Sequence, residues 1–157
     1  MRGQQGFSWQ ALQQAAAFCY RNNLALEDGM KWIDQSINIQ RTFANLRTKA
    51  QLLSKKGNTA EAEKLMKESM SLADEAQLNA YGYELIGQKK MDEALEIFKT
   101  NVKSYPQSWN AYDSLGETYL AMDNKKLALI NYKTALAKAP KEQTGRINGI
   151  IKTLEKN

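Results

Sequence analysis

Few side chains in this sequence could take part in catalysis, and their types limit which reactions are open. The chain has no histidine and one cysteine among its 157 residues. Catalytic triads and dyads that rely on histidine are therefore excluded, as is any zinc site with a histidine ligand. One thiol cannot form an intrachain disulfide or a thiolate cluster. Cys19 stands in the apolar run AAAFCY, so we predict a buried, structural thiol.

Pairs of carboxylates are the remaining candidates for general acid–base chemistry. Asp92 and Glu93 form one pair, and Glu61 and Glu63 form another. Both pairs stand where a helix is expected to begin, and there a negative charge complements the helix dipole. The nine glycines form no phosphate-binding motif. We therefore predict a protein that is not an enzyme and that binds no cofactor and no metal.

The composition favours a helical protein with an ordinary solvated surface. Hydrophobic residues make up 43% of the chain and charged residues 25%, and only two prolines occur. The net charge is +5, but the lysines are mixed with acidic residues, so we expect no nucleic-acid interface. No apolar run reaches transmembrane length, which argues against membrane insertion. The first ten residues lack the apolar core of a signal peptide.

An internal repeat organises the second half of the chain. Residues of the same kind recur at a spacing of 34 positions: Gly82 and Gly116, Ala94 and Ala128, Phe98 and Tyr132, Pro106 and Pro140. Each repeated unit holds two amphipathic stretches joined by a short polar turn. Four coincidences at one spacing predict a helix–turn–helix repeat.

These residues resemble the tetratricopeptide repeat. In the unit 109–142 the family's positions are filled by Tyr112, Leu115, Gly116, Tyr119, Ala128, Tyr132, Ala135 and Pro140. The unit 75–108 follows the same pattern but has Asn101 where a small residue is expected. The resemblance implies an all-α, right-handed α-solenoid of about four helix–turn–helix repeats plus a C-terminal capping helix, within a single domain 1–157.

The two earlier repeats match the pattern less closely. A third unit covers about 43–74, and a divergent first unit covers about 8–41. At the position of Gly116 the four units carry only small residues: Ala17, Ala50, Gly82 and Gly116. Small residues let the backbones of two helices approach closely. We therefore predict that the second helix of each pair fits against this position.

A helix over 144–156 is expected to close the array. Its apolar side chains recur at helical spacing on one face: Ile147, Ile150, Ile151 and Leu154. Such a stripe would cover the exposed edge of the last repeat. The alternative is an amphipathic helix that binds a partner or dimerises. Trp9 and Trp32 lie on apolar stripes of the first two helices, so we expect both in the core.

The family resemblance also indicates where a partner would bind. It implies that the first helix of each pair lines a concave groove through the fifth and ninth positions of its unit. These positions hold Gln14, Phe18, Arg47, Gln51, Asn79, Tyr83, Asp113 and Glu117. The alternative is that these side chains are ordinary exposed surface. Because Asp113 and Glu117 are acidic, they would repel a carboxylate ligand, and we predict no binding of C-terminal chaperone-tail peptides.

The leading hypothesis is a protein-interaction scaffold that binds a protein or peptide segment of unknown identity. The second is a structural helical domain that packs on a neighbouring domain. The segments GFSWQALQQAAAFC and WIDQSI resemble the C-terminal part of certain bacterial proteins of unknown function, in which a β-rich domain precedes a short repeat array. That resemblance implies a fragment of an exported protein, whereas a complete chain would be cytoplasmic. Both alternatives remain open, as does the oligomeric state.

Overall fold

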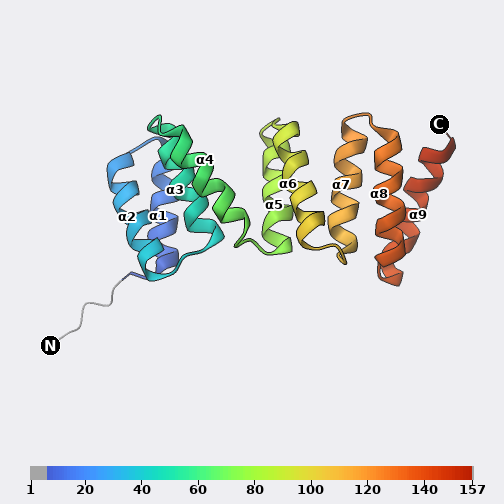
Figure 1. The fold of residues 1–157 in the computed structure, drawn as a ribbon, viewed down its shortest axis with the longest axis horizontal. Coiled ribbons are helices and arrows are strands. Elements are labelled where there is room, and N and C mark those ends of the chain that lie inside the picture. Colours follow the sequence, from blue (N-terminus) through green and yellow to red (C-terminus); the bar gives the residue numbers. More distant parts are fainter. Residues whose placement is uncertain (1–6, 157) are drawn as a thin grey trace. The chain divides into compact units, whose positions relative to one another are not determined.

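The computed structural model describes residues 7–156, which are predominantly helical (Figure 1). Within that range it contains nine α-helices and no β-strand. They are α1 (Trp9–Asn22), α2 (Leu26–Ile39), α3 (Phe43–Lys55), α4 (Thr59–Met70), α5 (Glu75–Gly87), α6 (Met91–Ser104), α7 (Trp109–Ala121), α8 (Lys125–Lys138) and α9 (Lys141–Lys156). The predicted all-α class is confirmed. Over these residues, no helix combines the length and the hydropathy needed to cross a bilayer.

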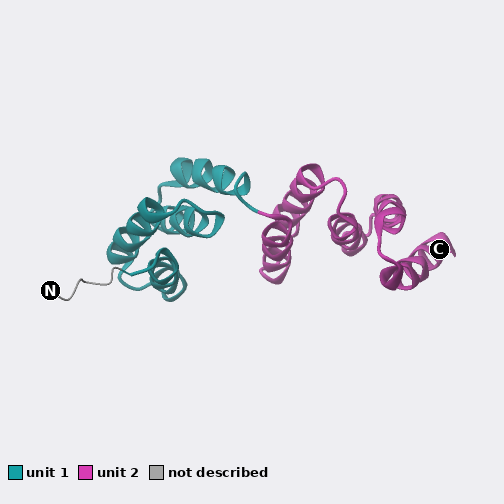
Figure 2. Ribbon diagram, turned by 90° about the horizontal axis from the view of Figure 1, so that it is seen from below, with its two compact units in different colours: residues 1–73 teal, residues 74–157 magenta. Residues whose placement is uncertain are grey.

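The chain divides into two compact units (Figure 2). Unit 1 is Met1–Ala73 and holds α1–α4, whereas unit 2 is Asp74–Asn157 and holds α5–α9. In unit 1, α1 packs on α2 and α3 packs on α4. In unit 2, α5 packs on α6, α7 packs on α8, and α9 packs on α8. The interpretation of 1–157 as one domain stays a prediction.

Side chains at the helix starts explain why the helices begin where they do. Thr42 accepts a hydrogen bond from the backbone of Asn45, whose own side chain accepts one from the Thr42 backbone. Asp74 and Gln77 form the same reciprocal pair at the start of α5. Each pair satisfies two N–H groups that the helix itself leaves without partners. Both units therefore contain a helix whose start is fixed by local sequence.

The turn inside each helix pair passes through a left-handed residue. These residues are Asn23, Gly57, Lys89 and Asp123, and their φ angles lie between 52° and 85°. The turn after α7 is closed by a hydrogen bond of 2.8 Å from the Asn124 N–H to the Tyr119 carbonyl. Only at Gly57 does the chain use glycine, which adopts this conformation without steric cost. The four turns therefore share a left-handed residue although their sequences differ, and the first turn contains a second one, Ala25.

In unit 2 the helices of each pair meet closely at a glycine. A Cβ added to Gly82 would lie 2.5 Å from the ring of Phe98, and one added to Gly116 would lie 3.2 Å from the ring of Tyr132. Phe98 is fully buried and Tyr132 is almost so. The second helix thus fits against the glycine of the first, as predicted, and it does so through an aromatic side chain that the sequence analysis did not identify as the contact. This packing offsets the cost of about 1 kcal/mol that glycine carries inside a helix.

In the first pair of unit 1 the close approach involves a glycine of the second helix. A Cβ added to Gly29 on α2 would lie 2.9 Å from the Cβ of Cys19 on α1. Cys19 is buried, which confirms the predicted structural thiol. Ala16, Ile33 and Leu52 form the adjoining core cluster, which joins α1, α2 and α3.

A buried group of polar side chains completes the interior of unit 1. The Ser36 hydroxyl donates to the Trp9 carbonyl at 2.8 Å, and the Asn45 amide donates to the Gln40 carbonyl at 2.6 Å. The same Asn45 amide lies 3.3 Å from the Ser36 oxygen. Ser36 and Asn45 have no solvent-exposed surface. These bonds connect α1, α2 and α3, and in unit 2 the buried Asn101 amide of α6 donates in a similar way to the Glu75 carbonyl of α5 at 3.4 Å.

The last helix caps the final pair. Ile147 and Ile151 are buried against Ala128, Tyr132 and Ala135 of α8, and Ile150 and Leu154 pack on the same cluster. The predicted capping helix is confirmed, although it begins at Lys141 and not at 144. The expectation that Trp32 is a core residue is wrong, because its side chain is 37% exposed next to the fully buried Ile33.

Candidate functional site

The predicted groove residues fall into two sets of four, one in each unit. In unit 1, Gln14 and Phe18 lie on α1, while Arg47 and Gln51 lie on α3. The side chain of Phe18 is 52% exposed, Gln14 is exposed, and the other two are partly buried. The Gln13 amide donates to the Thr48 hydroxyl at 3.0 Å and holds α1 against α3. Unit 1 thus offers an exposed aromatic ring and two amides on neighbouring first helices.

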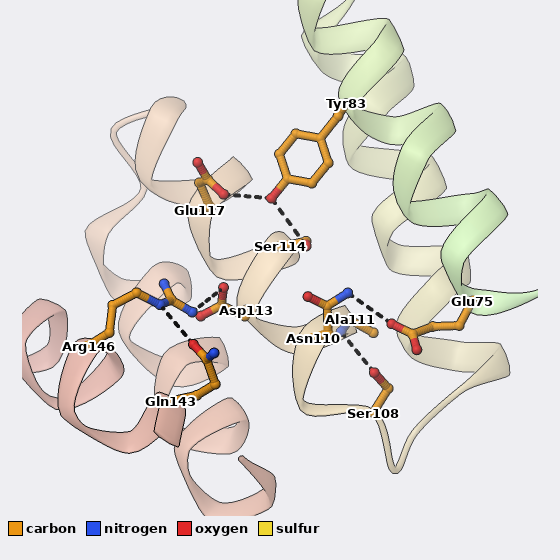
Figure 3. Close-up of polar contacts among 10 residues, drawn as sticks. All are labelled: Glu75, Tyr83, Ser108, Asn110, Ala111, Asp113, Ser114, Glu117, Gln143 and Arg146. Carbon is orange, nitrogen blue, oxygen red and sulfur yellow. Dashed lines mark hydrogen bonds and ion pairs between the residues drawn. The ribbon is translucent and has the colours of Figure 1, made fainter. Parts of the chain in front are cut away.

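In unit 2, Tyr83 and Glu117 are in direct contact across α5 and α7 (Figure 3). The Tyr83 hydroxyl donates to the Glu117 carboxylate at 2.6 Å and lies 3.2 Å from the Ser114 oxygen. The Tyr83 ring packs edge-on against Phe98, with centroids 5.2 Å apart. The same Phe98 lies above Gly82, so the close helix packing also fixes the position of Tyr83.

Burial raises the pKa of Tyr83 to about 12, and the hydrogen bond to Glu117 acts in the same direction. The pKa of Tyr132 is also raised to about 12, first by burial and then by the charges of Asp113 and Glu117. Both phenols therefore stay protonated at neutral pH. Tyr83 can donate a hydrogen bond there but is poorly suited to act as a base.

Asp113 is bound by an arginine of the capping helix. Its Oδ2 accepts a hydrogen bond of 2.8 Å from Arg146, whose Nε also lies 3.5 Å from the Gln143 oxygen (Figure 3). Asp113 is 8% exposed. The acidic side chain that was expected to face a partner is thus largely covered and is paired within the molecule. Its local charge is balanced, so repulsion of a carboxylate ligand would rest mainly on Glu117.

Two buried oxygens in this region have no hydrogen-bond donor. They are Oδ1 of Asp113 and Oδ1 of Asn79. Asn79 precedes Tyr83 by one helical turn, and Asp113 precedes Glu117 by one turn, so the two oxygens belong to the same face as the Tyr83–Glu117 contact. A buried acceptor without a donor costs about 1–3 kcal/mol. On this face it is the exposed Glu117 carboxylate that can accept hydrogen bonds from outside the chain.

A further polar contact ties the two first helices together near their N-terminal ends. The Asn110 amide donates to the Glu75 carboxylate at 3.0 Å (Figure 3). We name this surface the polar face of unit 2. It is formed by Glu75, Asn79, Tyr83, Asn110, Asp113, Ser114 and Glu117, with Arg146 at its edge.

Among the described residues, no three His, Cys, Asp or Glu side chains lie close enough together to hold a metal ion.

Sequence reasoning missed the contribution of Arg146 and Ser114. Ser114 follows Asp113 directly and so was not at the fifth or ninth position of its unit. Arg146 lies outside the four repeats, in the helix whose apolar stripe alone was analysed. Continuing the repeat into 141–156 would have placed α9 beside α7 and identified the arginine as a neighbour of Asp113.

No protein-family model matches the chain, and no curated protein does either. The solved structures do contain similar folds. MamA from strain AMB-1 is 13% identical, with a TM-score of 0.52 over 94% of this chain and 81% of its own. PilF of Pseudomonas aeruginosa is 16% identical, with a TM-score of 0.50 over 93% of this chain and 67% of its own. Both are proteins of tetratricopeptide repeats.

This chain has the tetratricopeptide-repeat fold. At 13–16% identity the similarity establishes the fold alone. The tetratricopeptide resemblance read from the 34-residue spacing is thereby confirmed. The role of the eight groove residues and the resemblance of the N-terminal segments to two-domain bacterial proteins stay predictions.

Proposed function

We propose that this protein is a non-catalytic scaffold for protein–protein interaction, and that the polar face of unit 2 binds an extended segment of its partner. The observation that carries the proposal is the contact between Tyr83 and Glu117, two exposed side chains that join the first helices α5 and α7 at 2.6 Å. The Tyr83 ring is also held by its edge-on packing against Phe98. A surface whose side chains are held in place binds with a smaller loss of entropy than a mobile one.

The chemistry of this face favours a ligand that donates hydrogen bonds. Glu117 is exposed and acidic, and its carboxylate has room for donors besides the Tyr83 hydroxyl. Backbone N–H groups of an extended peptide, or a lysine or arginine side chain, would supply the donors.

The residues of the polar face argue against an enzyme. Tyr83 is kept protonated, Asp113 is paired with Arg146, and no histidine exists to move a proton. A catalytic pair would need one group poised to accept a proton near neutral pH. The arrangement is suited to recognition, which requires fixed donors and acceptors.

Selection of peptides from a random dodecapeptide display library tests this function. The full-length wild type should enrich peptides that bind the double variant Asn79→Ala/Tyr83→Ala at least about tenfold more weakly, because central contact residues carry most of the binding energy. Ile130→Ala, which truncates an exposed side chain on α8, is the control and should bind as the wild type does. Equal binding by the double variant, or no enrichment at all, would contradict the proposed function.

A second candidate function is a structural domain that packs on a neighbouring domain. One observation favours it: Phe7 and Ile39 in unit 1 are 77% and 58% exposed. Together with Leu12, Gln35 and Asn38 they line a hollow of about 390 Å³. An exposed apolar hollow of this kind is typical of a surface that another protein region covers. If this function is correct, Phe7→Ser/Ile39→Ser should abolish binding of a purified neighbouring domain and leave peptide selection unchanged.

A further inference from the structure

A second hollow lies in unit 2 between α7, the start of α8 and α9. Its volume is about 500 Å³, and its lining residues are Leu120, Lys125, Arg146, Gly149, Ile150, Thr153 and Leu154. None of the eight predicted groove residues belongs to this set. We name it the capping-helix groove. It adjoins the polar face only through Arg146, which contributes to both.

A glycine forms part of the groove wall without a packing reason inside the chain. A Cβ added to Gly149 would meet no atom within 4 Å, in contrast to Gly82, whose added Cβ would lie 2.5 Å from Phe98. Glycine inside a helix costs about 1 kcal/mol relative to alanine. At Gly82 the close packing of Phe98 offsets that cost, but nothing within unit 2 does so at Gly149. The missing side chain leaves open space beside Ile150 and Leu154.

The charged side chains of the groove are both cationic. Arg146 uses one terminal nitrogen to bind Asp113, and its Nε points to Gln143. Lys125 is exposed and forms no ion pair within the described part of the chain. No acidic residue lines the groove. Because Arg146 is already paired with Asp113, Lys125 is the cation of the groove whose charge would complement an acidic side chain beside an apolar one.

We propose that the capping-helix groove binds a partner segment in which an apolar side chain is flanked by an acidic one. The apolar side chain occupies the space above Gly149, between Leu120 and the side chains of Ile150 and Leu154. The acidic side chain lies between Lys125 and Arg146. This site goes beyond the proposed function, because binding at the polar face needs neither Gly149 nor Lys125.

The random dodecapeptide library tests the site with Gly149→Leu, which fills the groove. The substitution removes a helix-breaking residue and meets no atom within 4 Å, so the variant should fold. Gly145→Leu is the matched control: it lies one turn earlier on α9, has the same free space and does not line the groove. We expect a class of wild-type-selected peptides that Gly149→Leu binds about tenfold or more weakly and Gly145→Leu binds unchanged.

A charge reversal tests the chemistry of the ligand. Lys125→Glu should weaken the same peptides about threefold to tenfold, and Lys126→Glu, on the neighbouring exposed residue, should change their affinity much less. The enriched peptides should carry Asp or Glu next to Leu, Ile, Met or Phe. Raising the salt concentration should weaken their binding to the wild type and have little effect on Lys125→Glu.

These experiments distinguish the two proposed sites, because each site is altered by its own variant. Peptides lost with Asn79→Ala/Tyr83→Ala but retained by Gly149→Leu would support the polar face and overturn the capping-helix groove. Peptides with the opposite behaviour would support the groove and contradict the proposed function. Failure to enrich any peptide that Gly149→Leu loses, or enrichment of basic peptides at Lys125, would overturn this inference.

Discussion

The two units share a helical repeat but use their polar side chains differently. In unit 1, Ser36 and Asn45 are fully buried and bind backbone carbonyls of other segments. In unit 2 Asn101 is also fully buried and its amide donates to the Glu75 carbonyl at 3.4 Å, but further polar contacts lie along the first helices, beside the aromatic rings packed on glycines. Buried polar groups therefore serve cohesion in both units, and unit 2 differs in the contact between Tyr83 and the exposed Glu117 along its first helices.

The difference lies in the side chains, because both units are built from the same kind of helix pair. A buried amide that binds a carbonyl is satisfied and has little left to offer a partner. An aromatic ring packed on a glycine needs no polar group, so the neighbouring surface is free to carry Asn79, Tyr83 and Glu117. We therefore propose that unit 2 binds the partner, and the following predictions test the contrast between the units.

The largest effect is expected where the helices of unit 2 are closest. Gly82→Leu should lower the free energy of unfolding by about 3 kcal/mol, because its side chain cannot be placed without displacing Phe98. Gly116→Leu should lower the free energy of unfolding by about 2 kcal/mol, since the Tyr132 ring lies farther from Gly116 than the Phe98 ring does from Gly82. Urea denaturation measures both, with Gly87→Leu as the control in open space. A stability of Gly82→Leu equal to that of the wild type would refute the aromatic–glycine packing.

The polar interior of unit 1 should respond to loss of a single amide. Asn45→Ala should cost about 2 kcal/mol, because it removes the bonds to the Gln40 carbonyl and to Ser36 and breaks the cap of α3. Hydrogen exchange followed by mass spectrometry should show the loss of protection in α1–α4. Asn38→Ala, on an exposed residue of α2, should change little. Equal loss of protection throughout unit 2 would show that the contrast between the units is not real.

The ion pair between α7 and α9 should make a smaller contribution. Arg146→Ala should cost about 1 kcal/mol, since the arginine is 46% exposed while the Asp113 side chain is 11% exposed. A double-mutant cycle with Asp113→Ala isolates the interaction itself. Additive effects of the two substitutions would mean that the pair does not couple the capping helix to the polar face.

The smallest effect is a dependence of stability on alkaline pH. Because folding raises the pKa of Tyr83 and Tyr132 to about 12, their stabilising contribution is complete below the unfolded pKa near 10 and is lost as pH rises from about 10 to 12. Unit 2, which holds both residues, should lose its exchange protection first in this range. Tyr83→Phe should reduce the dependence, and an unchanged alkaline profile in that variant would argue against the burial of its hydroxyl.

The repeat spacing was sufficient to predict most of the fold, because it reports the packing of each helix on its neighbours. Gly82, Gly116 and the stripe of Ile147 and Ile151 were assigned correctly for this reason. The burial of Trp32 was predicted wrongly, because an apolar stripe on a helix does not show which of its residues another helix covers. Arg146 was missed because contacts between polar side chains depend on register and side-chain direction, which the spacing of apolar residues does not specify.

The central claim is that the first helices of unit 2 form the binding surface. Amide chemical-shift mapping of the full-length protein, titrated with a peptide selected on the wild type, tests it most directly. The account predicts that the largest shifts fall on α5, α7 and α9, around Tyr83, Glu117 and Arg146. Largest shifts on α6 and α8, or throughout unit 1, would contradict it.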